Sequence, residues 1–365
     1  MKNSYDVAVI GGGPAGATFA RELALRQPQL QIALIDTKPK TGSKVCGGLL
    51  APDAQKVLAQ FDLNLPKSIL ADPQIFDVKT MDICSGITRN YQRHYLNMDR
   101  GAFDNWLLSL VPENVDILNG RCTEISRCEE GGFRLEIGTF SADIRAKYIV
   151  GADGASSIVR RNFFRPCKKK YIAIQEHFAD NTPDAPSYSC IFDPKTSDSC
   201  SWIIRKDGSL IFGGAFHSEN GRQAYEKQKA RLEQHLGRAF GEGIKVEACQ
   251  LTSPRSISDF VLGKDGAFLV GEAAGFVSAS SFEGISSAFL SGKYLADVFC
   301  DDPKKTLKSY KKATIKLRFK LFFKIYKMRI LCCPLLRFLI MKSGICSIRK
   351  YREERKVKNL TPRGA

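Results

Sequence analysis

Three glycines and one acid near the start of the chain have the types and spacing of a phosphate- and ribose-binding turn. Gly11, Gly13 and Gly16 follow an apolar run rich in β-branched residues, which is typical of a buried parallel strand. Asp36 ends a second apolar run, twenty residues after Gly16. Such glycines permit a tight turn and a close approach of pyrophosphate to the backbone, and such an acid accepts a hydrogen bond from a ribose hydroxyl. Glycines also occur in ordinary turns, but the position of the acid within one βαβ unit favours a dinucleotide site.

Two later stretches repeat the pattern of strand, glycine and acid. The run 146–160 passes from an apolar strand pattern into Asp153-Gly154, and the run 267–276 passes into Gly271-Glu272. Either turn alone is compatible with a surface loop. Three such turns in one chain predict a single nucleotide-binding sheet, interrupted at 166–255 by residues with the pattern of strands and hairpins.

The elements that must position these residues follow from periodicity and capping. A helix is predicted at 17–25, directly after the first glycine turn, and another at 99–107 with Asp99 as its N-cap. Further helices are predicted at 52–61 and 222–240. Short apolar or alternating runs predict strands at 76–81, 88–91, 115–118, 133–137, 188–192, 201–204 and 210–215.

The composition fits an ordinary globular protein with 365 residues and 44% hydrophobic residues, which leaves room for two domains. The folded pattern begins within six residues of Met1, so we expect no secretory signal. None of the twelve cysteines forms a C-x-x-C pair. We therefore expect reduced thiols in a cytoplasmic protein, with no metal site.

The positive charge lies in the C-terminal part of the chain. Residues 303–365 hold 20 of the 55 Lys and Arg residues but only 2 of the 38 Asp and Glu residues, so the rest of the chain is close to neutral. A chain this basic suggests nucleic acid first, but the pattern of the tail argues against that partner.

Basic and apolar residues in this tail recur at helical spacing. One stripe is Lys312, Lys316, Lys320, Lys324 and Lys327, and another is Ile315, Phe319, Phe322, Tyr326 and Ile330. Leu317, Leu321, Ile325 and Met328 are expected to widen the apolar side, and Pro334 to end the helix. This amphipathic pattern predicts contact of residues 303–345 with an anionic membrane surface, at the inner face of the cytoplasmic membrane. The alternative is a helix packed on the body of the protein with its lysines in solvent.

Several motifs together resemble one family. They are the glycine turn at 11–16, Cys46-Gly47-Gly48, Arg100 with Phe103-Asp104, Asp153-Gly154, and the run 271–276 with its continuation at 282–285. Over about residues 4–300 the chain resembles the FAD-dependent oxidoreductases of the p-hydroxybenzoate hydroxylase fold, and among them the geranylgeranyl reductase family.

The resemblance implies an α/β protein with a discontinuous, Rossmann-like FAD-binding domain. Its first part would be 1–165, with strands at 76–98 contributing to the substrate sheet, and its last part 256–302. Residues 166–255 would form an inserted antiparallel β-sheet substrate domain, and 303–365 a basic helical tail. The residues implied to bind FAD are Gly11, Gly13, Ala15, Gly16, Asp36, Cys46, Gly47, Arg100, Cys122, Asp153, Glu272, Gly284 and Ile285.

Within this set the resemblance assigns positions along the cofactor. Ala15 and Asp36 would hold the ADP half, Cys122 would lie near the adenine through its backbone, and Arg100 would contact the middle of FAD. The family has an aspartate at the position of Glu272, where it contacts the ribityl hydroxyls. Because the side chain of glutamate is longer, the loop that carries Glu272 must lie slightly further from the cofactor.

The remaining positions concern the isoalloxazine. Gly284 and Ile285 would cover its pyrimidine edge, where N–H groups at a helix start stabilise negative charge. Cys46 and Gly47 would lie beside the ring. Cys46 is the one cysteine singled out: it could relay a proton, but we favour a small residue packed between loop and cofactor.

The substrate side departs from the family. Many members carry Y-x-W-x-F-P in the inserted sheet, whereas this chain has the run 200–205, in which only Trp202 remains. Trp202 is a candidate for lining an apolar substrate pocket, with a core tryptophan as the alternative.

Three functions are consistent with these residues. The first is an FAD-dependent reductase of C=C bonds in an apolar substrate, such as an isoprenoid, at the membrane surface. The second is a flavin monooxygenase using NAD(P)H and O₂. The third is a membrane-associated regulatory or resistance protein in which FAD is largely structural. No second nucleotide fold is apparent, so NAD(P)H or another reductase would act as a transient electron donor.

Overall fold

The computed structural model divides the chain into two compact units. It describes residues 2–37, 45–138, 143–167, 170–180 and 188–351. Unit 1 comprises Met1–Leu70, Met98–Ala173 and Ala248–Met328. Unit 2 comprises Ala71–Asn97, Ile174–Glu247 and Arg329–Ala365. The basic tail predicted at 303–365 therefore forms no unit of its own, since its first part belongs to unit 1 and its second part to unit 2.

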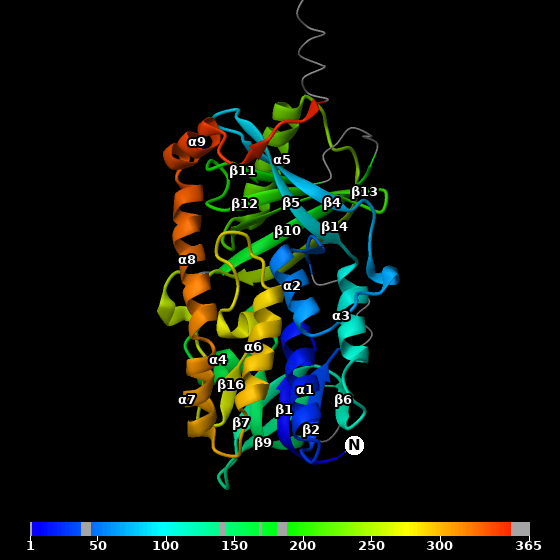
Figure 1. The fold of residues 1–365 in the computed structure, drawn as a ribbon, viewed down its shortest axis with the longest axis vertical. Helices are drawn as coiled ribbons and strands as arrows, with labels where there is room; N and C mark the ends of the chain where they lie inside the picture. Colours follow the sequence, from blue (N-terminus) through cyan, green and yellow to red (C-terminus); the bar gives the residue numbers. More distant parts are fainter. Residues whose placement is uncertain (1, 38–44, 139–142, 168–169, 181–187, 352–365) are drawn as a thin grey trace, which may run out of the picture. The chain divides into compact units, whose positions relative to one another are not determined.

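Unit 1 is built on a mainly parallel sheet with the strand order β15-β16-β9-β1-β2-β6 (Figure 1). Residues 7–10 of β1 and 32–35 of β2 are continuous buried apolar runs, because both faces of such a sheet are covered. The antiparallel pair β7 and β8 adjoins β9. Strand bounds are β1 Ser4–Ile10, β2 Ile32–Asp36, β6 Val115–Asn119, β7 Cys122–Arg127, β8 Phe133–Ile137, β9 Ile144–Gly151, β15 Gly263–Lys264 and β16 Ala267–Leu269. The short strand β3 (Leu49–Leu50) lies outside this sheet.

Helices cover this sheet, and α1 lies along α6 (Figure 1). Asp99 caps α3 as predicted, since its carboxylate accepts a hydrogen bond from the Ala102 amide at 2.6 Å. The helix bounds in unit 1 are α1 Pro14–Arg26, α2 Pro52–Gln60, α3 Arg100–Ser109, α4 Ile158–Phe163, α6 Ile285–Val298 and α7 Pro303–Ala313.

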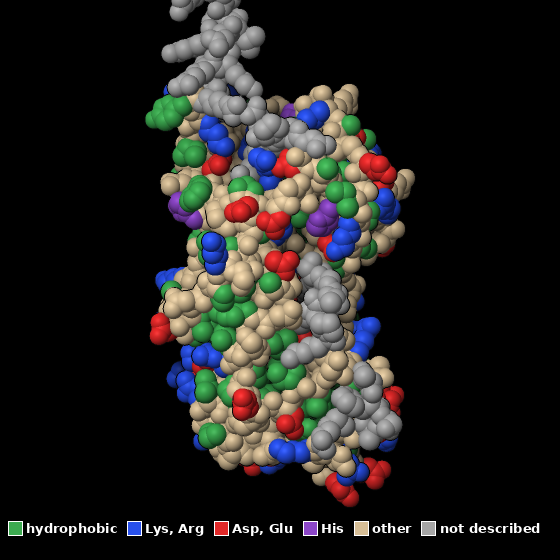
Figure 2. Space-filling model, turned by 90° about the vertical axis from the view of Figure 1, so that its right-hand side faces the viewer, with side chains coloured by type: hydrophobic (Ala, Val, Ile, Leu, Met, Phe, Trp, Pro, Cys, Tyr) green, Lys and Arg blue, Asp and Glu red, His purple; other side chains and the backbone are tan. Residues whose placement is uncertain are grey.

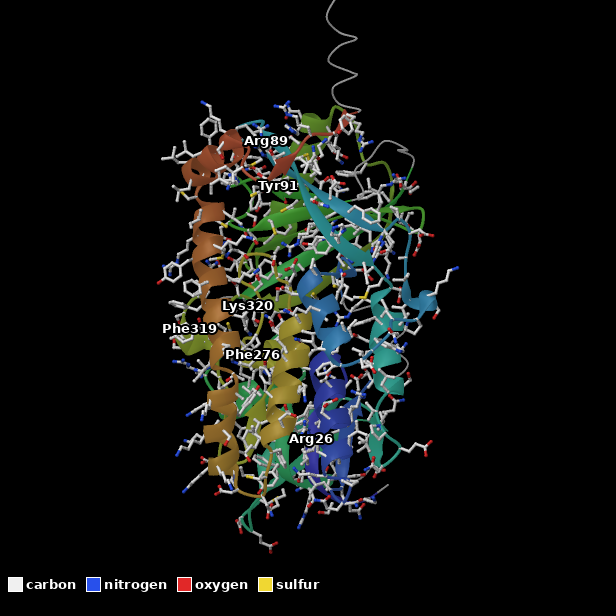
Figure 3. The ribbon with its side chains drawn as sticks, viewed as in Figure 1. Arg26, Arg89, Tyr91, Phe276, Phe319 and Lys320 are labelled. Atoms are coloured by element: carbon white, nitrogen blue, oxygen red, sulfur yellow. The ribbon has the colours of Figure 1, made fainter. Side chains whose placement is uncertain are left out.

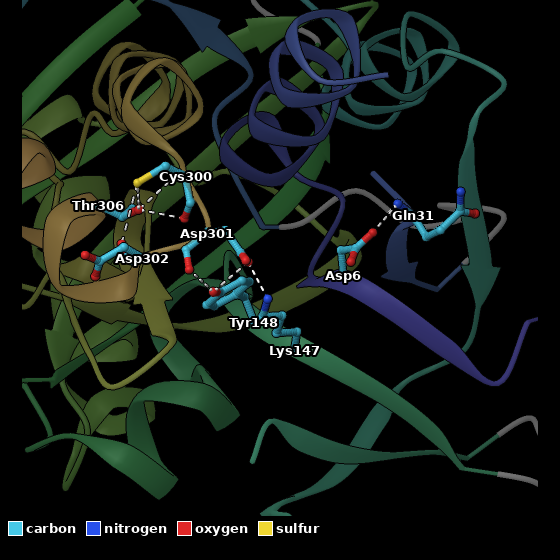
Figure 4. A network of polar contacts seen from close by, with 8 residues as sticks. All are labelled: Asp6, Gln31, Lys147, Tyr148, Cys300, Asp301, Asp302 and Thr306. Carbon is cyan, nitrogen blue, oxygen red and sulfur yellow. Dashed lines mark hydrogen bonds and ion pairs between the residues drawn. The ribbon is translucent and has the colours of Figure 1, made fainter. Parts of the chain in front are cut away.

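A polar network attaches the connection between α6 and α7 to the edge of β9 (Figure 4). The Tyr148 hydroxyl donates to the carbonyl and to the carboxylate of Asp301, at 2.9 and 3.0 Å. Asp302 caps α7, and the buried Tyr310 donates to the Leu269 carbonyl at 3.2 Å. The tail therefore begins as an integral part of unit 1.

Unit 2 contains a largely antiparallel sheet in which β14-β10-β13-β12-β11-β4-β5-β17 are neighbours. Helix α5 (Gly221–Leu236) covers one face of this sheet, where Tyr225 stacks on Phe212 with 5.3 Å between ring centroids. The strands are β4 Ile75–Asp82, β5 Thr88–Asn97, β10 Lys170–Ala179, β11 Tyr188–Phe192, β12 Cys200–Lys206, β13 Ser209–His217, β14 Gly243–Thr252 and β17 Ser347–Ile348. The boundaries between the units fall within β10, β14 and α8.

The tail continues as α8 (Ile315–Cys332) and α9 (Pro334–Ser343), with the break at Pro334 where it was predicted. One prediction about α8 is wrong. Leu317, Leu321, Ile325 and Met328 do not widen the exposed apolar side, because all four are buried. They follow the exposed apolar residues by two positions, or about 200° around a helix, and so face the opposite way. The packed arrangement that we kept as the alternative is therefore present on this side of α8.

Among the residues that the structure describes, no helix combines the length and the apolarity needed to cross a membrane.

Candidate flavin-binding site

The first glycine turn joins β1 to α1 through contacts that leave no room for side chains. Gly11 has a φ of 101°, and a Cβ there would lie 2.7 Å from the Ala152 carbonyl oxygen. A Cβ on Gly16 would lie 1.9 Å from the carbonyl oxygen of Gly11. The turn itself therefore requires both glycines.

Gly13 differs from these two because it borders open space. It is the N-cap of α1 in an extended conformation, and a Cβ built on it meets no atom of the described residues within 4 Å. Among the described residues no side chain caps α1, and the first turn of this helix has no acidic residue. The unused N–H groups of this helix start, together with an uncrowded glycine, form a cradle that fits a pyrophosphate.

Asp36 lies at the edge of this cradle. A Cβ on Gly12 would lie 2.7 Å from Asp36 Oδ2, so the glycine loop runs directly against the carboxylate. The Asp36 carbonyl accepts a hydrogen bond from the Gly120 amide at 3.0 Å, which holds the end of β2 beside β6. The sequence motif leaves position 12 unspecified, and the structure shows that Gly12 lies close to the side chains of Asp36 and Leu108.

The three glycine turns meet at the carboxyl ends of adjacent parallel strands. Ile10 of β1 pairs with Gly151 of β9, and Gly151 pairs with Leu269 of β16. A Cβ on Gly271 would lie 2.8 Å from the Ala15 side chain, which brings the third turn against α1. The predicted single nucleotide-binding sheet is therefore present, and this edge is where such sheets bind their ligands.

Asp153 in the second turn retains an acceptor that the protein leaves unused. Its Oδ2 accepts a hydrogen bond from the Ile158 amide at 2.6 Å. Its Oδ1 is buried and has no hydrogen-bond partner in the described part of the chain. Burial raises the pKa of this carboxyl, and its hydrogen bonds offset part of that shift. An orphaned acceptor fits a site completed by a hydroxyl- or amide-bearing ligand.

The third turn is held by Arg160, which sequence reasoning missed. The buried guanidinium donates to the carbonyls of Ala273 and Asp259, each at 2.9 Å, and to the Arg165 carbonyl at 3.2 Å. Burial lowers its pKa below the ordinary value for arginine. Arg160 acts as a positioning residue, because it fixes the backbone of the turn at Gly271–Ala274.

Thr252 binds the side chain of Glu272. Its Oε1 accepts hydrogen bonds from the amide and the hydroxyl of Thr252, at 3.0 and 3.3 Å. The Ser291 hydroxyl of α6 accepts from the Gly271 amide at 2.9 Å. The longer side chain at 272 therefore ties this turn to the end of β14. A contact with ribityl hydroxyls stays a prediction.

A buried cation lies beside Cys46. Arg100 Nε donates to Asp104 Oδ1 at 2.9 Å, and both side chains are buried. Burial alone lowers the pKa of Arg100, but the Asp104 carboxylate and Cys46 outweigh it and raise that pKa above its usual value. Gly48 donates to Cys46 Sγ at 3.4 Å and accepts from Met98 at 2.8 Å. The Cys46-Gly47-Gly48 run is thus held against the start of α3.

Cys122 begins β7 and is buried. Burial, with a smaller contribution from the negative charge of Asp153, raises the pKa of the Cys122 thiol to about 12. A thiol with such a high pKa stays protonated at neutral pH, so it does not act as a nucleophile there. A buried, unreactive thiol agrees with the expectation that only the backbone of Cys122 lies near the adenine.

We expect Cys122 to resist alkylation in the native protein between about pH 7 and pH 9, because the reactive thiolate forms only above its pKa. The exposed Cys84 and Cys346 serve as internal controls and should react. Iodoacetamide labelling followed by peptide mass spectrometry measures all three in one sample. Labelling of native Cys122 at the rate of Cys84 would contradict the buried, protonated state.

Gly284 and Ile285 mark the start of α6. Gly284 is the N-cap, and no side chain in the part of the chain that the structure describes caps this helix. The chain approaches it through Phe282, which has a φ of 53°, an uncommon conformation for a residue with a side chain. The uncapped N–H groups supply the partial positive charge expected at the pyrimidine edge of a flavin.

Trp202 belongs to unit 2 and lies on β12 opposite Gly213. A Cβ on Gly213 would lie 2.7 Å from the indole Nε1, so the glycine makes room for the ring. This Nε1 is buried without a hydrogen-bond partner among the described residues. Trp202 is only of intermediate burial, so a pocket-lining position and a core position for its ring both stay predictions.

All twelve cysteines lie in the described part of the chain as free thiols. Within the same ranges, no three His, Cys, Asp or Glu side chains come together closely enough to hold a metal ion.

Comparison with known proteins shows the family to which this chain belongs. The model of the FAD dependent oxidoreductase family matches residues 62–298. Protein CbrA of Shigella flexneri serotype 5b is 46% identical over 360 residues, which cover 96% of each chain. Protein CbrA of Escherichia coli O6:H1 is 45% identical with the same coverage.

Solved structures share the fold. A geranylgeranyl bacteriochlorophyll reductase-like protein from Thermoplasma acidophilum superposes with a TM-score of 0.74 at 20% identity, covering 91% of this chain and 88% of that one. A flavin-dependent brominase gives 0.68 at 19% identity, covering 94% of both chains. A probable FAD-dependent monooxygenase from Pseudomonas aeruginosa gives 0.68 at 16% identity, covering 94% and 100%. These similarities establish an α/β flavoprotein fold of the p-hydroxybenzoate hydroxylase type.

Proposed function

This chain belongs to the FAD-dependent oxidoreductases, among the relatives of CbrA, and from that premise we propose that it is a reductase of C=C bonds in an apolar substrate such as an isoprenoid. The substrate would be presented at the inner face of the cytoplasmic membrane. NAD(P)H or a separate reductase would be the transient electron donor. FAD, when bound, supplies the transfer of a hydride or of two electrons.

The residues of unit 1 have separate roles in holding this cofactor. The open cradle at Gly13 would bind the pyrophosphate, and Asp36 beside Gly12 would bind a ribose hydroxyl. The uncapped start of α6 at Gly284 would stabilise negative charge on the bound cofactor. Arg160 and Thr252 would position the third turn through their hydrogen bonds to it, without contacting the cofactor themselves.

One observation favours a reductase over a monooxygenase. The Cys46-Gly47-Gly48 run is hydrogen-bonded to the Met98 amide and lies beside the buried Arg100, and it is among the motifs through which the chain resembles geranylgeranyl reductases. A rigid loop beside a fixed cation would keep the reacting edge of the cofactor ordered and shielded from water. The proposal therefore depends on the geometry of this loop more than on the overall fold.

Anaerobic reoxidation tests the proposal. The purified flavoprotein is reduced without oxygen by NAD(P)H or dithionite, and the flavin absorbance is followed after adding O₂ or a bacterial lipid extract. We expect reoxidation by lipid without O₂, with mass spectrometry showing a lipid that has gained two hydrogens. O₂ uptake coupled to NAD(P)H oxidation and substrate hydroxylation would favour the monooxygenase. A flavin that no donor reduces would favour a structural cofactor.

A further inference from the structure

Helix α8 repeats a three-residue pattern of an apolar residue, a lysine and a second apolar residue. The repeats are Ile315-Lys316-Leu317, Phe319-Lys320-Leu321, Phe323-Lys324-Ile325 and Tyr326-Lys327-Met328. Their starting positions are four, four and three residues apart, which is the spacing of one helix face. Since each residue turns the helix by about 100°, the pattern produces three parallel stripes.

The inner stripe consists of Leu317, Leu321, Ile325 and Met328, and it anchors the helix. All four side chains are at most 5% exposed, and Met328 Sδ lies 3.3 Å from Arg255. These contacts lie within unit 1. The inner stripe is therefore the apolar face that this amphipathic helix buries against its own protein.

The outer stripe lies opposite and consists of Ile315, Phe319, Phe323 and Tyr326. These side chains are 43, 54, 66 and 47% exposed. In Figure 3, Phe319 lies on the outer side of α8, whereas Lys320 lies on the side from which it reaches Asp53 of α2, at 2.8 Å. Scattered exposed apolar residues are common, but four large ones in helical register on one helix form a patch.

The lysine stripe consists of Lys316, Lys320, Lys324 and Lys327 and runs along one flank of the outer stripe. It lies in the segment 303–365, where basic residues outnumber acidic ones by 20 to 2. The face of the molecule shown in Figure 2 differs, because there Lys and Arg side chains lie among Asp and Glu side chains. Within α8 every charged side chain is basic, and one of them, Lys320, pairs with Asp53 of α2.

We propose that the outer stripe and the lysine stripe of α8 form a surface that docks on an anionic lipid bilayer. The aromatic side chains would enter the boundary between headgroups and acyl chains, and the lysines would contact lipid phosphates. The helix would lie in the plane of the membrane, held from behind by the inner stripe. This surface depends on neither FAD nor the reaction.

In unit 2, α9 has an exposed apolar surface of its own. Leu335, Leu336, Leu339 and Ile340 are 65, 43, 52 and 41% exposed, while Arg337 on the same helix is buried against Asp82 at 3.1 Å. The three-four spacing again places these aliphatic side chains together. They form a second exposed apolar patch, which substitutions can remove without changing α8.

Vesicle sedimentation with the full-length, FAD-loaded protein tests the docking surface. We expect binding to vesicles of phosphatidylcholine with about 30% phosphatidylglycerol, weaker binding to pure phosphatidylcholine, and release as salt increases. Phe319→Ser with Phe323→Ser should weaken binding at least about tenfold, since two half-exposed aromatic rings no longer enter the bilayer. Lys316→Gln with Lys327→Gln should weaken binding to the anionic vesicles by roughly fivefold per lysine.

The matched control replaces equally exposed apolar residues elsewhere. Leu25→Ser on α1 and Phe76→Ser on β4 remove side chains that are 59 and 67% exposed, and they should leave vesicle binding unchanged. Flavin content and the thermal unfolding midpoint of every variant should match the wild type, because all these side chains face solvent. These readouts separate loss of docking from loss of folding.

Three outcomes would overturn the docking surface: wild-type protein that does not sediment with anionic vesicles, Phe319/Phe323 variants that bind as the wild type does, or variants that only convert a dimer to a monomer. A protein that binds vesicles but reduces no lipid would contradict the proposed reductase and support the docking surface. The two proposals can therefore fail separately.

Discussion

A Gly16→Ala variant is expected to lose FAD and to lose about 3 kcal/mol or more of its unfolding free energy. The new Cβ would lie 1.9 Å from the Gly11 carbonyl oxygen, a backbone atom that has no other rotamer to adopt. Relief requires α1 to move away from β1, yet α1 also packs along α6. Urea unfolding and the flavin absorbance of the purified protein measure the two losses together.

Gly13→Ala is the matched control for this variant. A Cβ at Gly13 meets no protein atom within 4 Å, and its φ of −73° is open to alanine. Replacing a glycine N-cap with alanine costs about 1 kcal/mol at most, so the protein should fold. Its affinity for FAD should nevertheless fall at least tenfold, or about 1.4 kcal/mol, because the methyl group occupies the cradle. A folded Gly13→Ala protein with wild-type affinity would show that the pyrophosphate does not lie there.

Arg100→Met should destabilise the protein by about 3–5 kcal/mol and reduce its flavin content, because it leaves the Asp104 carboxylate buried without its partner. Burial of an uncompensated charge costs more than the loss of one surface ion pair. Denaturant unfolding measured with and without added FAD separates the intrinsic loss from the loss of ligand stabilisation.

A second variant separates the structural role of Arg100 from its predicted contact with FAD. Arg100→Met combined with Asp104→Leu removes both charges and should recover most of the stability of the apoprotein, as replacement of buried pairs by apolar residues often does. Affinity for FAD should stay low, since the cation is still missing. Recovery of both properties would show that Arg100 only holds α3 and the Cys46 loop together.

Local features explain why so much of unit 1 could be predicted. The turn at 11–16, the helix after it and Asp36 lie within one βαβ segment, so backbone sterics and short-range periodicity specify them together. The N-cap Asp99 and the break at Pro334 are equally local. Each follows from residues within a few positions of one another, which a sequence displays directly.

Non-local contacts account for what was missed. Arg160 reaches carbonyls at positions 259 and 273, and Glu272 reaches Thr252, across intervals that carry no periodic signal. The close approach of Gly12 to Asp36 also joins positions that are distant in the sequence. The sequence pattern also could not tell which apolar stripe of α8 is buried, because two stripes of similar hydrophobicity lie on opposite sides of that helix.

The sequence by itself determined a flavin-binding sheet, its glycine turns and a basic, apolar C-terminal helix, because these depend on backbone conformation and on the regular geometry of single elements. Only the tertiary structure decided how the turns are held, where the two units divide the chain, and which side of α8 faces solvent. Those features depend on side chains from distant segments filling the same space, and packing of that kind leaves no pattern in a linear sequence.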